Sequence, residues 1–212
     1  MPFDLWAGFV AASVALLLIP GPTVLLVLSY ALSKGRSVAL ASAAGVALGD
    51  FVAMSASLAG LGALVLASAT LFTLLKWVGA AYLIFMGWRL LRSAARTGSG
   101  PEEAQLAPLP GIGAGSVFWH AAAVTALNPK SIVFFIAFVP QFLRPEAPLL
   151  PQFSILIASF VGLAALNALA YALLADRLRR RIARPSVLAW LTRAGGAALI
   201  ALGFATAALR RA

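Results

Sequence analysis

The sequence contains no cysteine and a single histidine, His120. Without cysteine the chain cannot form disulfides, thiolate metal sites or dithiol redox relays. One imidazole is too few for a histidine metal site, and we therefore expect neither a metal nor a cofactor. His120 lies one turn into an apolar segment beside Trp119, where an interfacial polar residue is favoured over a proton relay.

Charged residues are also scarce. They make up 10% of the 212 residues, whereas hydrophobic residues make up 62%, and the mean hydropathy is +0.99. A soluble domain of this size would have too little polar surface to cover itself. Two segments, Leu5–Ser33 and Ala147–Ala175, carry no charge, and each is longer than the ~20 residues that a membrane-spanning helix needs. The composition therefore predicts an all-α integral membrane protein.

Apolar segments separated by polar loops predict six transmembrane helices. The second segment contains one charge, Asp50, and the fourth contains one, Lys130. The expected spans are Leu5–Leu32, Val38–Leu66, Leu71–Leu91, Val117–Phe142, Phe153–Ala175 and Val187–Leu209.

The second half of the chain contains a weak copy of the first half. Three patterns recur in the same order: the run Ile19-Pro20-Gly21-Pro22 is matched 107 residues later within Leu127-Asn128-Pro129-Lys130, Gly45–Asp50 recurs as Gly162–Asn167, and Gly79–Gly87 recurs as Gly195–Gly203. We expect one transmembrane domain, residues 1–212, with repeat one at 1–96, a flexible linker at 97–115 and repeat two at 116–212. Three spans in each repeat place the two copies in opposite orientations. Inverted repeats of this kind are typical of secondary transporters.

The distribution of charge among the loops predicts the orientation. The first, third and fifth loops carry most of the lysines and arginines, whereas the second has no charge and the fourth has only Arg144 beside Glu146. The positive-inside rule places the three basic loops in the cytoplasm and both termini outside. The net charge of +10 is therefore mainly a topology signal. We expect anionic membrane lipid, and no nucleic acid, beside these loops.

Proline residues interrupt the first and fourth spans at equivalent places. Pro20 and Pro22 flank Gly21, and Pro129 follows Asn128. Because proline lacks a backbone donor and clashes with the preceding turn, we expect each helix to be broken there. An ordinary kink is the alternative. Breaks at matching places in two copies favour a substrate site built from discontinuous helices.

Helices are expected to begin again at Thr23 and at Lys130, from opposite sides of the membrane. Their free N–H groups and positive dipole ends favour an anion such as a carboxylate. Asp50, roughly 18 Å into the second span at ~1.5 Å per residue, favours a cation or a proton. A salt bridge between Asp50 and Lys130 that only closes the bundle is the alternative, and the two interpretations can coexist. Asn167 occupies the position of Asp50 in the second copy, where it either hydrogen-bonds the substrate or packs.

Four motifs lead to a known family. They are Pro20-Gly21-Pro22, Gly45-x-x-x-Gly49-Asp50, Lys76–Leu83 with Gly87, and Asn128-Pro129-Lys130-Ser131 followed by Phe138-Val139-Pro140-Gln141-Phe142. On these motifs the chain resembles, over essentially its full length, the LysE/RhtB family of amino-acid exporters, of the threonine/homoserine/lysine efflux type. The resemblance implies a carrier in the cell (inner) membrane that moves amino acids or close derivatives outward, driven by the membrane potential or a proton gradient. Many such relatives carry a carboxylate where this chain has Asn167, which leaves Asp50 as the one deeply buried carboxylate.

Together these features predict a secondary transporter that works by alternating access at a midplane site. The half-helix N-termini and Lys130 would bind the carboxylate of an amino acid, and Asp50 would bind its ammonium group or exchange it for a proton. A channel or small-ion exporter with the same architecture is the alternative function. An enzyme is not expected, because no Ser–His pair or metal-ligand cluster falls at membrane depth. The sequence does not identify the amino acid, the coupling ion or the oligomeric state, and a homodimer is one of the possible states.

Overall fold

In the computed structural model all the regular secondary structure of the described residues is helical. The described part of the chain comprises residues 1–18, 21–34, 36–67, 69–93, 113–144 and 147–175, with 190, 193–194, 196–198, 200–201 and 204. In chain order the elements are α1 (Phe3–Leu18), α2 (Pro22–Lys34), α3 (Arg36–Ala67), α4 (Ala69–Ser93), α5 (Ala114–Ala126), α6 (Pro129–Ala137), the short 3-10 helix η1 (Val139–Phe142) and α7 (Leu149–Leu173). No strand occurs in these ranges, and the expected all-α class is confirmed for them.

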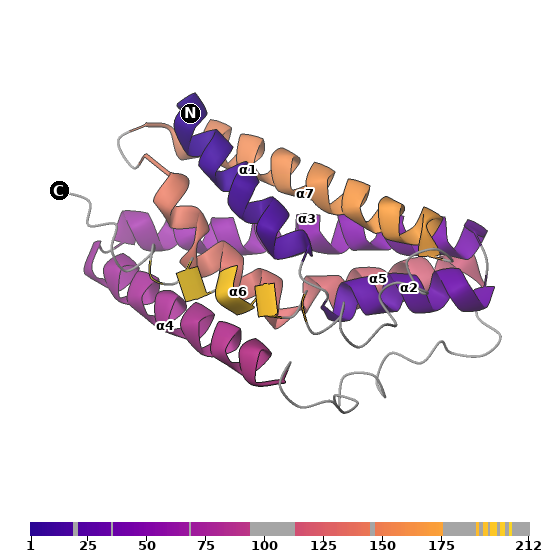
Figure 1. The fold of residues 1–212 in the computed structure, drawn as a ribbon. Helices are drawn as coiled ribbons and strands as arrows, with labels where there is room; N and C mark the ends of the chain where they lie inside the picture. Colours follow the sequence, from indigo (N-terminus) through magenta and orange to yellow (C-terminus); the bar gives the residue numbers. More distant parts are fainter. Residues whose placement is uncertain are drawn as a thin grey trace.

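Two long helices run through the bundle, and shorter helices occupy its two ends. Figure 1 shows α3 and α7 extending along most of the bundle, with α1 and α6 towards one end and α2 and α5 towards the other. α3 packs against both α5 and α7, and α4 packs against α6. The helices before and after each break therefore lie at opposite ends of the molecule.

Two helices are long and apolar enough to cross a membrane by themselves, over Ser37–Ala63 and Leu149–Leu173. They correspond to the second and fifth expected spans. Two bent pairs, α1 with α2 (57°) and α5 with the Pro129–Phe142 segment (45°), bring the number to four if each pair is one span. α4, at the third expected span, is not among these helices, and the sixth expected span lies largely outside the described residues.

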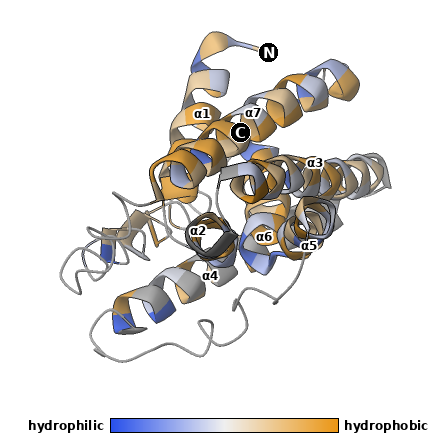
Figure 2. Ribbon diagram, turned by 90° about the vertical axis from the view of Figure 1, so that its right-hand side faces the viewer, coloured by the Kyte–Doolittle hydropathy of each residue, from blue (hydrophilic) through white to orange (hydrophobic). Residues whose placement is uncertain are grey.

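Large apolar side chains are exposed on the outer faces of the helices. Phe51 of α3, Leu74 of α4 and Leu166 of α7 are 49%, 59% and 66% exposed. Hydrophobic residues cover much of α1, α3 and α7 (Figure 2). A soluble monomer rarely exposes so many large apolar groups, whereas lipid solvates them at no cost. The surface therefore fits a membrane environment.

Both helix breaks have proline as the first residue of the following helix. α2 begins at Pro22 and α6 begins at Pro129, each one residue before the start expected from the sequence. A proline loses no hydrogen bond at the first helical position, since the N–H there has no partner within the helix. Asn128 caps α6, and its Oδ1 accepts a hydrogen bond from the backbone N–H of Lys130 at 3.1 Å. Pro20 lies outside the described residues.

Two glycines bring the backbones of α3 and α5 into contact. A Cβ added at Gly45 would overlap the carbonyl oxygen of Phe118, and a Cβ at Gly49 would lie 2.5 Å from that of Ala122. Only glycine permits an approach this close, as in the small-xxx-small contacts of membrane helices. This contact places Asp50, the next residue of α3, beside the break between α5 and α6.

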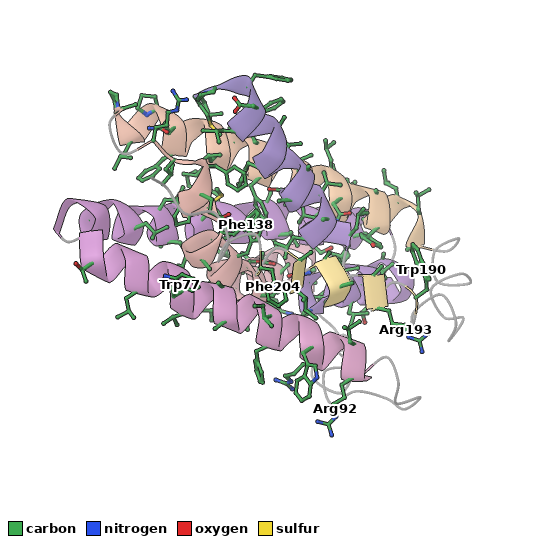
Figure 3. All side chains as sticks on the ribbon, turned by 60° about the vertical axis from the view of Figure 1, so that its left-hand side comes forward. Trp77, Arg92, Phe138, Trp190, Arg193 and Phe204 are labelled. Carbon is green, nitrogen blue, oxygen red and sulfur yellow. The ribbon has the colours of Figure 1, made fainter. Side chains whose placement is uncertain are left out.

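The buried apolar side chains form two clusters. The α1–α6 cluster includes Phe9, Leu16, Met54, Phe134, Phe135 and Phe160, and the α2–α5 cluster includes Val27, Tyr30, Val46, Val117, Ala168 and Ala172. Phe138, labelled in Figure 3, belongs to the α1–α6 cluster and lies inside the bundle. α3 and α7 contribute to both clusters. On α3 the division falls at Asp50, and on α7 it falls at Asn167.

Candidate functional site

A cavity of about 40 Å³ lies where the two helix breaks meet α3 and α7. Apolar residues of both clusters form part of its wall, including Leu16 and Ala164 from the α1–α6 cluster and Val27 and Ala168 from the α2–α5 cluster. The cavity therefore lies between the two clusters. At ~10–15 Å³ for each water molecule it has room for roughly three.

Most of the site residues expected from the sequence line this cavity. The six that do so are Gly21, Thr23, Asp50, Asn128, Lys130 and Asn167. Pro22 and Pro129 begin α2 and α6 and shape the two breaks without being part of the wall. Pro20 lies outside the described residues. The structure thus brings together residues that are separated by more than a hundred positions in the sequence.

The cavity residues include three pairs that the repeat expected from the sequence relates to each other. With Pro22 aligned on Pro129, the first residue of each following helix, Gly21 corresponds to Asn128 and Thr23 to Lys130, and Asp50 corresponds to Asn167. Both members of each pair line the cavity. In transporters built from two inverted copies, related positions meet where the copies face each other, and the substrate site usually lies there.

Side chains from the second half of the chain complete the end of α1. Lys130 Nζ donates a hydrogen bond to the carbonyl oxygen of Leu16 at 2.9 Å, and Asn167 Nδ2 donates one to that of Leu17 at 3.2 Å. The last carbonyls of a helix have no partner within the helix, and in a membrane they are costly to leave unpaired. Lys130 and Asn167 therefore stabilise the broken end of α1 from α6 and α7.

A further hydrogen bond joins the two breaks to each other. Asn128 Nδ2 donates to Thr23 Oγ1 at 3.3 Å, while Asn128 Oδ1 caps α6. The amide of Asn128 thus uses both of its ends, one on its own helix and one on α2. The first turns of α2 and α6 are held at the same wall of the cavity.

The cavity contains one acidic and one basic side chain. Asp50 is 3% exposed, and the positive charge of Lys130 acts on its carboxylate. The other acid in the described ranges, Asp4, is exposed in the first turn of α1. Asp50 is therefore the one buried carboxylate of the described residues. An amino acid carries one negative and one positive group, so its charges match this pair.

Other polar groups of the wall were not expected from the sequence. Ser131 and Tyr171 both line the cavity. Tyr171 lies four residues after Asn167 on α7 and so on the same helix face, a spacing that could have indicated it. Within the described residues no group of three His, Cys, Asp or Glu side chains could hold a metal ion. The polar lining is made of hydroxyls, amides and one charge of each sign.

Comparison with known proteins shows full-length relatives. Residues 14–209 match the family model described as LysE type translocator. A homoserine/homoserine lactone efflux protein of Salmonella typhimurium is 33% identical over 220 aligned residues that cover all of both chains. An uncharacterized membrane protein of Vibrio cholerae is 32% identical over 206 residues, 96% of both chains. No solved structure matches the chain significantly.

These matches extend over both halves of the sequence, including the helix breaks and the cavity residues. The family model begins in α1 and continues to within a few residues of the C-terminus. The resemblance seen in the sequence motifs is thereby confirmed. The chain belongs to the LysE type translocator family, whose members are membrane transport proteins.

Proposed function

We propose that this translocator exports an amino acid or a close derivative across the cytoplasmic membrane by alternating access. The observation that carries the proposal is the cavity between the two apolar clusters, with Asp50 and Lys130 in its wall. The Salmonella relative named for homoserine and homoserine lactone efflux supports this substrate class. Homoserine, with its charged backbone groups and a short hydroxyl side chain, is the first compound to test.

The geometry supports a division of roles among the cavity residues. Lys130 and the first turns of α2 and α6 bind the substrate carboxylate, because helix N-termini present free N–H groups and positive dipole ends. Asp50 binds the ammonium group, and a proton from outside replaces it after release. Asn128, Asn167 and Thr23 line the same cavity and hydrogen-bond the rest of the substrate through the donors and acceptors that are not used in the bonds described above. Each charged group of the substrate then meets a partner, as transfer out of water requires.

Access to the site requires the two clusters to open in turn. A cavity with room for roughly three water molecules is too small for an amino acid, so helices must move apart to admit it. Separating α2 from α5 opens one end, and separating α1 from the α6–η1 segment opens the other. The breaks at Pro22 and Pro129 allow the half-helices at each end to move separately.

The six-span inverted-repeat arrangement, with both termini outside, is part of the proposal. The paired cavity positions and the two bent helix pairs support it. Basic residues lie at the proposed cytoplasmic ends, among them Arg92, which projects from the last turn of α4 (Figure 3). Its guanidinium lies 5.2 Å from the ring centroid of Trp88, an aromatic residue of the kind that anchors helices at the interface.

Single cysteines provide the test of topology, because the chain contains none of its own. Cysteines at positions Arg36, Thr97 and Pro185 are expected to be shielded from an impermeant thiol reagent in intact cells. Cysteines at positions Ala69 and Ala147 are expected to be labelled. The measurement compares labelling before and after the cells are permeabilised, which exposes the shielded set. Labelling of Pro185→Cys from outside in folded protein would overturn the six-span arrangement.

Exchange kinetics separate a carrier from the alternative, a channel or small-ion exporter. Proteoliposomes loaded with unlabelled homoserine are expected to take up labelled homoserine faster than empty ones, with a rate that saturates. A carrier must reorient for each molecule, and a loaded return step speeds the exchange. A flux that rises linearly with concentration and ignores the internal homoserine would favour a channel. Liposomes without protein give the background rate.

A further inference from the structure

The only histidine of the chain is bonded to a fully buried tyrosine on another helix. Tyr30, near the end of α2, is 0% exposed, and its hydroxyl lies 2.8 Å from Nδ1 of His120 on α5. The two rings also meet edge to face, at an interplanar angle of 89°. Both the hydrogen bond and the ring contact fix the distance between α2 and α5.

This contact lies in the cluster that closes one end of the cavity. Tyr30 belongs to the α2–α5 cluster, whose members Val27, Val46 and Ala168 also line the cavity. α2 follows the first break and α5 precedes the second, so the contact joins the two repeats. These are the helices that must separate before a substrate can reach the cavity from their end.

The two ends of the bundle are closed by different kinds of contact. The α1–α6 cluster contains stacked aromatic rings, with Phe135 and Phe160 at a centroid distance of 4.8 Å and Phe134 and Phe138 at 5.1 Å. The α2–α5 cluster contains many small side chains, including Ala39, Ala121 and Ala172. Small side chains bury little apolar area, so a single hydrogen bond contributes a larger share of the stability of this end.

We propose that the Tyr30–His120 hydrogen bond is the latch of the α2–α5 gate, and that its breaking opens the cavity towards the cytoplasm. The direction of opening rests on the orientation given under the proposed function. The role of the hydrogen bond in holding the gate closed rests on the observed contact between Tyr30 of α2 and His120 of α5. Both residues are positioning residues that control access and do not touch the substrate.

The test measures the accessibility of a cysteine placed in the cavity wall. Ala168→Cys puts one thiol in a chain that has no other, on the stretch of α7 that lines the cavity. Its rate of labelling is compared in inside-out and right-side-out vesicles. Tyr30→Phe, His120→Phe and the double variant are each added to this reporter. Both replacements keep an aromatic ring and remove the hydrogen bond.

Each single variant is expected to raise labelling from the cytoplasmic side about fivefold, the factor that corresponds to the ~1 kcal/mol net contribution of one hydrogen bond. The double variant is expected to match the singles, because all three lack the same bond. Labelling from the outer side should stay the same or fall. The matched control is Ser159→Ala, which removes the 2.9 Å hydrogen bond from Trp6 Nε1 that joins α1 to α7. It should leave the cytoplasmic rate unchanged.

If labelling is unchanged in both single variants, or rises equally from both sides, the Tyr30–His120 hydrogen bond does not hold the α2–α5 gate closed. If labelling rises only from the outer side, the role of the hydrogen bond is supported and the proposed orientation in the membrane is wrong. The assay contains no substrate, so a failure of homoserine exchange would contradict the proposed function and leave this result standing.

Discussion

Replacing Asp50 with asparagine is expected to abolish uphill transport while the protein remains folded. The substitution keeps the size of the side chain and its hydrogen-bonding capacity, and removes its ability to carry a charge or exchange a proton. Asp50 is the one buried carboxylate of the described residues, so no other acid within these ranges can replace it in the cavity. In proteoliposomes with an imposed pH gradient, accumulation of substrate should fall to the level without a gradient.

Two further variants make this result specific. Asp4→Asn changes an exposed acid of α1 and should transport like the unmodified protein. Asn167→Ala removes a neutral hydrogen bond to the carbonyl of Leu17, worth about 1 kcal/mol, and should weaken transport without abolishing it. Lys130 keeps its bond to the carbonyl of Leu16 in every variant, which limits the loss of stability. All proteins should elute as single species in detergent. Near-normal accumulation by folded Asp50→Asn would mean that Asp50 is structural.

Gly49→Ala is expected to disrupt the packing of α3 against α5. The added Cβ would lie 2.5 Å from the carbonyl oxygen of Ala122 and 2.7 Å from Cβ of Thr125, so two helix backbones would have to move apart. Overpacking of this kind costs about 1–3 kcal/mol. A lower midpoint of thermal unfolding in detergent, with a lower yield of folded protein, is the expected measurement.

Gly60→Ala on the same helix is the matched control. A Cβ at Gly60 meets nothing within 4 Å, so the substitution only removes backbone freedom from the unfolded chain. It should leave the unfolding midpoint unchanged or raise it, because alanine in a helix interior is up to about 1 kcal/mol more favourable than glycine. Equal losses at the two positions would show that the α3–α5 contact is not the cause.

The broken helices and their polar residues could be predicted from the sequence because proline has a definite local effect. Pro22 and Pro129 each stand at a break, and the neighbouring Thr23 and Lys130 reach the cavity as expected. The helix starts were wrong by one residue, since proline itself occupies the first helical position. Asp50 could be identified because a charge in an apolar helix of this length needs a partner.

Other parts of the site depend on contacts that no local pattern records. Lys130 and Asn167 donate hydrogen bonds to backbone carbonyls of α1. Because every residue has a backbone carbonyl, the sequence does not indicate which ones accept these bonds. The position of His120 beside Trp119 predicts an interfacial residue but not its hydrogen bond, because its partner, Tyr30, is ninety positions away on another helix. The six-span arrangement stays a prediction, since the sixth expected span lies largely outside the described residues.

The capping of α1 by residues of the other half has an evolutionary consequence. The carbonyls of Leu16 and Leu17 receive hydrogen bonds from Lys130 and Asn167, so the first copy does not complete its own broken helix. On the inverted-repeat proposal, an ancestor with one copy per gene would have obtained such hydrogen bonds from an oppositely inserted twin. On the same proposal, gene duplication and fusion would have made that pairing permanent. The two equivalent positions would then have been free to diverge, into the carboxylate of Asp50 in one half and the amide of Asn167 in the other.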